Sequence, residues 1–174
     1  MVLRMNNLYA QPLMPMHDEE EIQLEPTYLE CLSLVERLHR RLLDVIKDEF
    51  ERLGWHEVNA VQALLLHNIG DNELTAGELK SRGYYLGSNV SYNLKKLVDK
   101  QFVEHKRSTE DKRSVRIKLT IKGQEVRETL DELFSRQIAQ IEQVGDLSLG
   151  EMSIFVNSLR KLERFWADQI RFRL

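Results

Sequence analysis

Cysteine, proline and glycine are all scarce in this chain of 174 residues, which holds one Cys, three Pro and eight Gly. A single cysteine excludes a disulfide framework and a zinc site built from cysteines. So few prolines and glycines argue against a turn-rich all-β fold and favour long helices. No apolar run approaches the roughly 18–20 residues that a membrane span needs. We therefore expect a cytoplasmic protein that does not enter a membrane, with one domain or one domain and an appendage.

The common signatures of catalysis are missing as well. The sequence contains no glycine-rich phosphate loop, no Gly-x-Ser-x-Gly and no His-x-x-x-His spacing. The five histidines are scattered along the chain (His17, His39, His56, His67 and His105). We expect neither an enzyme nor a metal site, and no cofactor.

The charge is distributed unevenly, although the net charge is only −3. From Lys80 to Lys122 there are 12 basic and four acidic residues, a balance of +8, whereas the rest of the chain carries 13 basic and 24 acidic residues, a balance of −11. A basic block inside an acidic protein is typical of a nucleic-acid-binding face. A solvated basic surface is the alternative that charge alone leaves open.

Helix start and stop signals divide the chain into segments. Residues 1–26 contain all three prolines and no hydrophobic periodicity, which predicts an extended arm. A capping box at Thr27 and Glu30 opens a long helix that Gly54 ends. Further helices are predicted at 59–69, 75–83 and 88–100, then from Thr120 to a break at Gly145, and from a capping box at Ser148 to the C-terminal region.

The first and the last two helices are too long for a compact body of this size. With roughly 24–27 residues each they span about 35–40 Å, whereas the expected radius of gyration is near ~16 Å. Their apolar stripes then need a second copy of the chain to pack against, which predicts a homodimer. An isolated coiled coil is the alternative, but the apolar spacing fits 3.6 better than 3.5 residues.

A switch to period two predicts a β-hairpin. Val115, Ile117 and Leu119 alternate with basic residues, and segment 102–107 is the expected partner strand. Short helices followed by a hairpin are the order of a winged helix-turn-helix, a mainly α fold with a small β-hairpin wing (α+β). The predicted organisation is an N-terminal arm (1–26), a dimerisation helix (27–55), a winged helix-turn-helix region (56–119) and C-terminal dimerisation helices (120–174).

The helix expected at 88–100 suits the major groove. Its apolar stripe consists of Val90, Leu94, Leu97 and Val98, and no acid occurs between Leu79 and Val98. Asn pairs well with adenine, Ser and Tyr reach base edges or phosphates, Lys suits phosphates, and a helix start attracts phosphate. The expected DNA contacts on this helix are Ser88, Asn89, Ser91, Tyr92, Asn93, Lys95 and Lys96. An ordinary exposed helix face is the alternative.

The hairpin loop supplies a second predicted contact with DNA. Arg113, next to Lys112, lies where the tip of a wing enters a narrow minor groove, whose negative potential attracts arginine. Asp111 is placed to orient the Arg113 guanidinium by a charge-assisted hydrogen bond. Alternatively, Asp111 and Arg113 only brace the turn.

These residues carry a family resemblance. Asp111-Lys112-Arg113-Ser114-Val115 followed by Leu119-Thr120-Ile121-Lys122-Gly123 resembles the D-x-R-S…L-T-x-x-G wing signature of MarR-family transcriptional regulators, and the likeness extends from about Val58 to Gly123. Segment 83–98 is similar to the LdtR-like subgroup of alphaproteobacteria, which is associated with cell-envelope regulation. The resemblance implies a homodimer, a pseudo-palindromic DNA site and, often, a small-molecule effector bound between the dimer helices and the winged domain.

Two further features remain open from the sequence. His39, Arg40, Trp55 and His56 lie near the expected domain junction and are candidates for an effector pocket, with satisfied core positions as the alternative. Cys31 is expected to be a buried small hydrophobe rather than a redox sensor. The predicted function is that of a sequence-specific transcriptional regulator. The alternative is a dimeric interaction module that has lost DNA binding and uses its wing for protein contacts.

Overall fold

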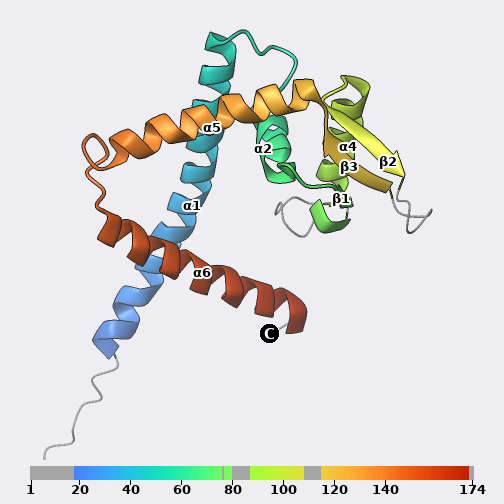
Figure 1. The fold of residues 1–174 in the computed structure, drawn as a ribbon. Helices are drawn as coiled ribbons and strands as arrows, with labels where there is room; N and C mark the ends of the chain where they lie inside the picture. The colour runs from blue at the N-terminus through green and yellow to red at the C-terminus, as the bar shows by residue number, and fades with distance from the viewer. Residues whose placement is uncertain (1–17, 76, 80–86, 108–114, 173–174) are drawn as a thin grey trace, which may run out of the picture. The chain divides into compact units, whose positions relative to one another are not determined.

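The computed structural model describes residues 18–75, 77–79, 87–107 and 115–172. The fold is mostly helical with one small antiparallel sheet, as Figure 1 shows, which confirms the predicted fold class. The chain divides into two compact units, residues 1–43 and 44–174, and each is described by itself. Over the described ranges, none of the helices is long and apolar enough to cross a membrane.

The first helix starts earlier than the sequence predicted. α1 covers Asp18–Arg52, 35 residues with Pro26 inside, so the segment expected as an extended arm is partly helical. The expectation that the helix starts at the Thr27 capping box is therefore wrong. The physical reason lies upstream, because an acidic run from Asp18 to Glu21 favours the positive end of a helix. Pro26 removes one backbone donor and crowds the preceding turn, and the helix of 35 residues nevertheless continues through it.

The end of α1 and the start of α2 follow the local signals. Gly54 has a φ of 81°, and Trp55 N donates to Phe50 O at 2.8 Å, which forms the expected glycine stop. α2 covers Ala60–Ile69. Its N-cap is Asn59, which forms a reciprocal capping box with Gln62.

The sheet has three antiparallel strands in the order β1-β3-β2. β2 (Val103–Arg107) and β3 (Val115–Leu119) form the predicted hairpin, with Val103 opposite Leu119. β1 (Leu74–Thr75) pairs with the outer side of β3, Leu74 opposite Ile117. β1 was not predicted from the sequence, because a strand of two residues shows no periodicity.

The remaining helices match their predicted positions closely. α4 covers Gly87–Asp99, α5 covers Ile121–Ile141 with Thr120 as N-cap, and α6 covers Leu149–Phe172. Ser88 was expected to cap α4, but it lies one residue inside the helix, which begins at Gly87. Its backbone N–H is still among the first four, which have no partner within the helix. Residues 77–79 are helical, and the predicted stop of that short helix at Gly83 lies outside the described residues.

A single apolar core holds the second unit together. It combines the end of α1, the α2 face, the inner side of the sheet and the first half of α5 (Ile46, Phe50, Leu65, Leu66, Ile69, Leu79, Val90, Leu97, Phe102, Ile117, Val126 and Leu130, among others). α2 packs against α5, and α4 packs against β2. The apolar sides of α4 and of the sheet are thereby buried within the unit, and the polar side of α4 is exposed to solvent.

Candidate nucleic-acid interface

The apolar stripe of α4 seats the helix on its scaffold. Val90, Leu94 and Leu97 are buried, as the spacing predicted, and Val98 is half-buried. Because these positions repeat every three or four residues, they fix which side of α4 faces away from the core. That side is built from residues 89, 92, 95 and 96.

The outward side of α4 is polar and basic. Asn89, Ser91, Lys95 and Lys96 are exposed, and Tyr92 is 60% exposed. The Lys96 ammonium lies 4.5 Å from the centre of the Tyr92 ring, so the aromatic face holds this cation on the surface. The backbone of Ser88 lies in the first turn of α4, and its side chain lies outside the described residues.

Asn93 differs from its neighbours on α4. It is half-buried, and both ends of its side-chain amide have partners in the chain. Asn93 Nδ2 donates to Asn89 O at 2.9 Å, and Asn93 Oδ1 accepts from Gln62 Nε2 at 3.2 Å. The sequence placed Asn93 with the base-reading residues, and nothing in the helical period distinguished it from them.

Part of the basic block is engaged inside the protein. Lys122 Nζ lies 2.6 Å from Glu57 Oε2 and 4.2 Å from the Phe102 ring centre, and Lys100 Nζ donates to Glu57 O at 2.5 Å. The hydrogen bond from Lys122, together with the charges of both lysines, lowers the pKa of the Glu57 carboxyl below its usual 4.5. Arg116 donates to Glu73 O at 3.4 Å. These cations join the loop before α2 and the loop before β1 to the rest of the unit, so they are not available to a polyanion in the way that Lys95 and Lys96 are.

The predicted tip of the wing lies between the two strands of the hairpin in the sequence. β2 ends at Arg107 and β3 begins at Val115, and Asp111, Lys112 and Arg113 fall in the segment 108–114, outside the described residues. The strands that carry this segment are described, and their register brings Arg107 opposite Val115. The loop is therefore attached at the far end of the hairpin from Val103 and Leu119.

The base of the hairpin is locked to α5 by backbone and hydroxyl contacts. Thr120 N donates to Phe102 O at 3.1 Å, Thr120 Oγ1 donates to Gln101 O at 2.7 Å, and Gly123 N donates to Thr120 Oγ1 at 3.1 Å. A Cβ on Gly123 would lie 2.1 Å from Phe102 O. The Leu-Thr-x-x-Gly pattern thus corresponds to a junction where the helix start presses against the strand before it.

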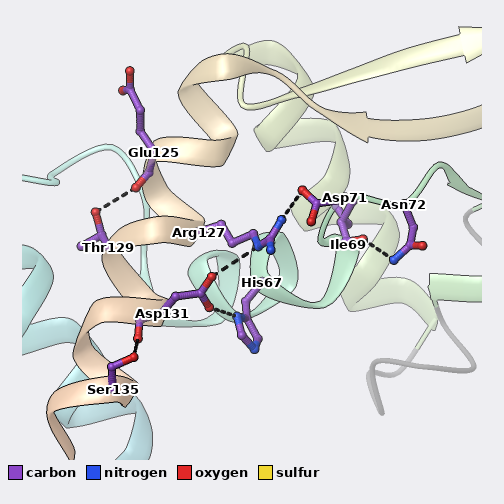
Figure 2. A network of polar contacts seen from close by, with 9 residues as sticks. All are labelled: His67, Ile69, Asp71, Asn72, Glu125, Arg127, Thr129, Asp131 and Ser135. Atoms are coloured by element: carbon purple, nitrogen blue, oxygen red, sulfur yellow. Dashed lines mark hydrogen bonds and ion pairs between the residues drawn. The ribbon is translucent and has the colours of Figure 1, made fainter.

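A polar network joins α2 to α5, as Figure 2 shows. Arg127 on α5 contacts Asp71 after α2 at 2.5 Å and Asp131 on its own helix at 3.4 Å. His67 Nδ1 on α2 lies 2.9 Å from the other oxygen of Asp131, and the imidazole meets Phe134 edge-on at 5.5 Å. The contact with Asp71 raises the pKa of the Arg127 guanidinium above its usual value. The network fixes α2 on α5.

A hollow of about 430 Å³ lies between α4 and the hairpin. Leu94, Val98 and Ile117 provide its apolar wall, and Ser91, Lys95, Asp99 and His105 provide its polar rim. The four residues expected to form an effector pocket do not appear in this hollow. His39 and Arg40 are exposed on α1 in the first unit, and in the second unit Trp55 is half-buried and His56 exposed after Gly54.

Cys31 on α1 is half-buried, so the expectation of a buried cysteine is only partly met. No group of three His, Cys, Asp or Glu side chains gathers into a possible metal site within the residues that the structure describes.

Known proteins resemble the chain over these same elements. The family model "Winged helix DNA-binding domain" matches residues 58–123. The exopolysaccharide II synthesis transcriptional activator ExpG of Rhizobium meliloti is 33% identical over 161 residues, which cover 91% of this chain and 81% of that protein. Among solved structures, Streptococcus pneumoniae FabT in complex with DNA has a TM-score of 0.66 at 18% identity, covering 81% of this chain and 98% of FabT. A mutant Escherichia coli MarR complexed with operator DNA has a TM-score of 0.64 at 22% identity, covering 80% and 98%.

This chain belongs to the MarR family of winged-helix regulators. The family consists of transcription regulators rather than enzymes, in line with the expectation from the sequence, and the chain is a DNA-binding regulator. The matched range 58–123 begins just before α2 and ends at Gly123, so it contains α2, α4 and the whole sheet. The similarity to the LdtR-like subgroup remains a prediction from the sequence.

Proposed function

We propose that this MarR-family chain controls transcription in the bacterial cytoplasm by binding a pseudo-palindromic operator as a homodimer. The observation that carries the proposal is the outward side of α4, which is free of acidic residues from its start to Val98 and presents Lys95 and Lys96 beside exposed hydrogen-bonding side chains. A helix of this kind, seated on a sheet by its apolar stripe, fits the major groove of B-form DNA.

We assign the DNA contacts by the chemistry of each side chain. Asn89 and Tyr92 read base edges, Ser91 contacts a base edge or a phosphate, and Lys95 and Lys96 bind phosphates. The backbone start of α4 at Gly87 and Ser88 binds a further phosphate, because its first N–H groups have no partner within the helix. On the wing, Arg113 enters the minor groove with Asp111 orienting its guanidinium and Lys112 next to it on the backbone.

The exposed apolar side of α6 supports the homodimer. No residue of α6 is buried within the chain, and its apolar side chains are exposed: Phe155 by 43%, Phe165 by 51% and Ile170 by 81%. A 24-residue amphipathic helix without a buried face has the composition of an interface rather than of a solvent-exposed helix. We assign this side of α6, together with the apolar positions of α1, to packing on a second copy.

A small-molecule effector is part of the same proposal. The hollow between α4 and the hairpin has a volume in the range of ligand pockets, which is roughly 300–1,000 Å³. A molecule with an apolar body and an acidic group suits Leu94 and Ile117 below and Lys95 at the rim. Because Lys95 and Ser91 are also proposed DNA contacts, such a molecule would compete with DNA. The hollow replaces residues 39, 40, 55 and 56 as the favoured pocket.

The name of the Rhizobium meliloti relative supports a role for this chain as a transcriptional activator of exopolysaccharide synthesis. This agrees with the cell-envelope role that the LdtR-like resemblance implies. A reporter fused to a selected operator, measured with and without the protein, distinguishes activation from repression.

The test of the proposed function is a selection from random DNA with the purified full chain. We expect one enriched motif with two inverted half-sites about one helical turn apart, since a symmetric dimer presents two α4 helices. Enrichment of no motif contradicts the proposal and favours an interaction module.

Two variants distinguish base contacts from minor-groove contacts. Asn89→Ala should relax the base preference at one base pair per half-site, at a cost of roughly 1–3 kcal/mol in binding free energy. Arg113→Ala should weaken binding most to operators whose flanks are rich in A·T.

A further inference from the structure

Gln62 is the one polar residue among the described part of the chain that is fully buried, at 3% exposure. A buried side-chain amide is costly unless its oxygen and its nitrogen both find partners. Gln62 Oε1 accepts from Asn59 N at 3.2 Å, which is half of the capping box of α2. Its nitrogen faces the other way and donates to Asn93 Oδ1 at 3.2 Å.

The hydrogen bonds continue from Gln62 into α4, the proposed recognition helix. Asn93 accepts from Gln62 and donates to Asn89 O, one turn earlier on α4. The chain of contacts therefore runs from the first turn of α2, through two side-chain amides, to the backbone of α4 at the residue proposed to read a base. The apolar stripe of α4 is non-directional and permits small rotations or slides of the helix. A hydrogen bond between α2 and α4 is directional and restricts both movements.

We propose that Gln62 and Asn93 are positioning residues that fix the rotation of the recognition helix on α2, and that Asn93 does not read a base. This inference rests on the proposed function, because it concerns how α4 is presented to the operator. Each end of the Asn93 amide has a partner in the chain, and these two bonds fix the direction in which the half-buried amide points. The bidentate pairing with adenine that a base-reading asparagine makes requires the amide to turn its oxygen and nitrogen together toward the base edge. Turning the Asn93 amide in this way would take its oxygen away from Gln62 and leave the buried Gln62 nitrogen without that partner.

The chain offers variants that separate positioning from stability. Gln62→Met keeps the shape of the buried side chain and removes its link to Asn93. Asn59→Ala removes only the acceptor for Gln62 N at 2.9 Å, so it weakens the cap of α2 but leaves the Gln62–Asn93 bond in place. Asn93→Ala removes the bond from the α4 side. Asn93→Ser keeps a hydroxyl that donates to the carbonyl four residues earlier, as Ser135 does to Asp131 O at 2.8 Å, and that can accept from Gln62.

The experiment is a base-preference profile of each variant over the half-site of the operator selected with the wild-type chain, with affinity for unrelated DNA and its salt dependence measured alongside. For Gln62→Met and Asn93→Ala we expect the operator affinity to fall about tenfold. The loss should be spread over every base pair that α4 reads, because the whole helix is displaced. Affinity for unrelated DNA and its salt slope should stay unchanged. The double variant should lose no more operator affinity than the single variant that binds the operator more weakly, because both changes remove the same interaction.

The control variants give the opposite expectation. Asn59→Ala should lower thermal stability without changing the base-preference profile, and Asn93→Ser should recover most of the affinity that Asn93→Ala loses. If Asn93→Ala erases the preference at a single base pair and Asn93→Ser behaves like it, Asn93 reads a base and the inference is wrong. The comparison of Asn93→Ala with Asn93→Ser decides this even if Gln62→Met does not fold. A wild-type chain without base preference would instead refute the proposed function, which the wild-type profile alone reveals.

Discussion

Gly123 lies where the first turn of α5 crosses the backbone of Phe102, and a Cβ at this position would lie 2.1 Å from the Phe102 carbonyl oxygen and 3.1 Å from its carbon. Both atoms belong to the backbone, so neither can swing away. The same carbonyl accepts from Thr120 N, so moving it also breaks a bond that holds the hairpin to α5. The glycine of the family motif is thus required by a close approach of two backbones.

We predict that Gly123→Ala lowers the free energy of unfolding by at least about 2–3 kcal/mol, because the helix start and the strand must separate. The matched control is Gly150→Ala at the start of α6, where a Cβ would meet only Ser148 Oγ at 3.9 Å. That change should be neutral or stabilising by up to ~1 kcal/mol, because alanine favours the helix more than glycine does. Urea unfolding of both variants at one protein concentration checks this. Equal stability of the two variants would contradict it.

Among single residues, the sequence predicted outward positions better than partners. The period of α4 correctly separated Val90, Leu94 and Leu97 from the exposed Asn89 and Lys96. It did not reveal that Asn93 meets Gln62, because a contact between residues 31 positions apart depends on how α2 and α4 pack. Likewise, the tally of basic residues did not reveal that Lys100 and Lys122 are held by Glu57, since charge counts do not show partners.

At the level of elements, Glu57 joins the loop before α2 to the start of α5. Its carboxylate meets Lys122, and its backbone oxygen meets Lys100. The pKa of Glu57 is lowered by the hydrogen bond from Lys122, so the folded state favours the ionised carboxylate. A lowered folded-state pKa gives a stabilising contribution that is complete above the usual value of 4.5 and is lost as pH falls through the folded value.

We therefore predict that Glu57→Gln is less stable than the wild type near pH 7 and that the difference shrinks as the pH falls below 4.5 and through the lowered folded-state pKa of Glu57. Lys122→Met should show the same pH dependence. The double variant should lose no more stability than the less stable of the two single variants, because both changes remove the same ion pair. Urea unfolding between pH 3 and pH 7 measures the differences. A Glu57→Gln difference that is the same at pH 3 and pH 7 would show that the ion pair contributes nothing to stability.

Elements with strong end signals were predicted closely, and weakly signalled ones were not. Thr120 with Gly123 and Ser148 with Glu151 each mark a helix start that the structure reproduces. At the second start, Ser148 Oγ donates to Glu151 Oε2 at 2.6 Å and accepts from Glu151 N at 3.3 Å. β1 has only two residues and exists because Leu74 and Thr75 pair with β3, a tertiary cause. The early start of α1 was not predicted, because residues 1–26 show no hydrophobic periodicity and contain all three prolines, although Pro26 lies inside a helix of 35 residues.

For the whole molecule, the exposed apolar side of α6 predicts the assembly. The chain should run as a dimer of about 41 kDa, twice its mass of 20.5 kDa, at micromolar concentration. Phe155→Glu together with Leu159→Glu should shift it toward the monomer, because both side chains belong to the apolar stripe. Asn157→Glu is the matched control, since it adds a charge off this stripe. Light scattering measures the mass. A wild-type monomer would contradict the architecture, and dissociation by Asn157→Glu would place the interface on another side of α6.

The uneven distribution of charge over the whole chain determines which side can face a polyanion. A protein with a net charge of −3 binds a polyanion by presenting its +8 segment, from Lys80 to Lys122, while the −11 remainder faces away. Within the described residues, Lys95 and Lys96 are exposed on α4, whereas Lys100 and Lys122 are engaged by Glu57. With the wing residues and the start of α4, each subunit offers about three to five phosphate contacts, so a dimer neutralises roughly 6–10 phosphates.

The logarithm of the operator affinity should therefore fall against the logarithm of the salt concentration with a slope of about −5 to −9. Lys95→Met with Lys96→Met removes up to four phosphate contacts per dimer and should flatten the slope by ~3–4, with little change in base preference. Lys100→Met with Lys122→Met is the matched control: it removes the same charge, but from cations that already have partners in the protein. Its slope should stay near that of the wild type. Binding measured from about 50 to 300 mM salt compares the three proteins. Equal flattening in both double variants would mean that overall charge, rather than the outward side of α4, determines how the protein meets DNA.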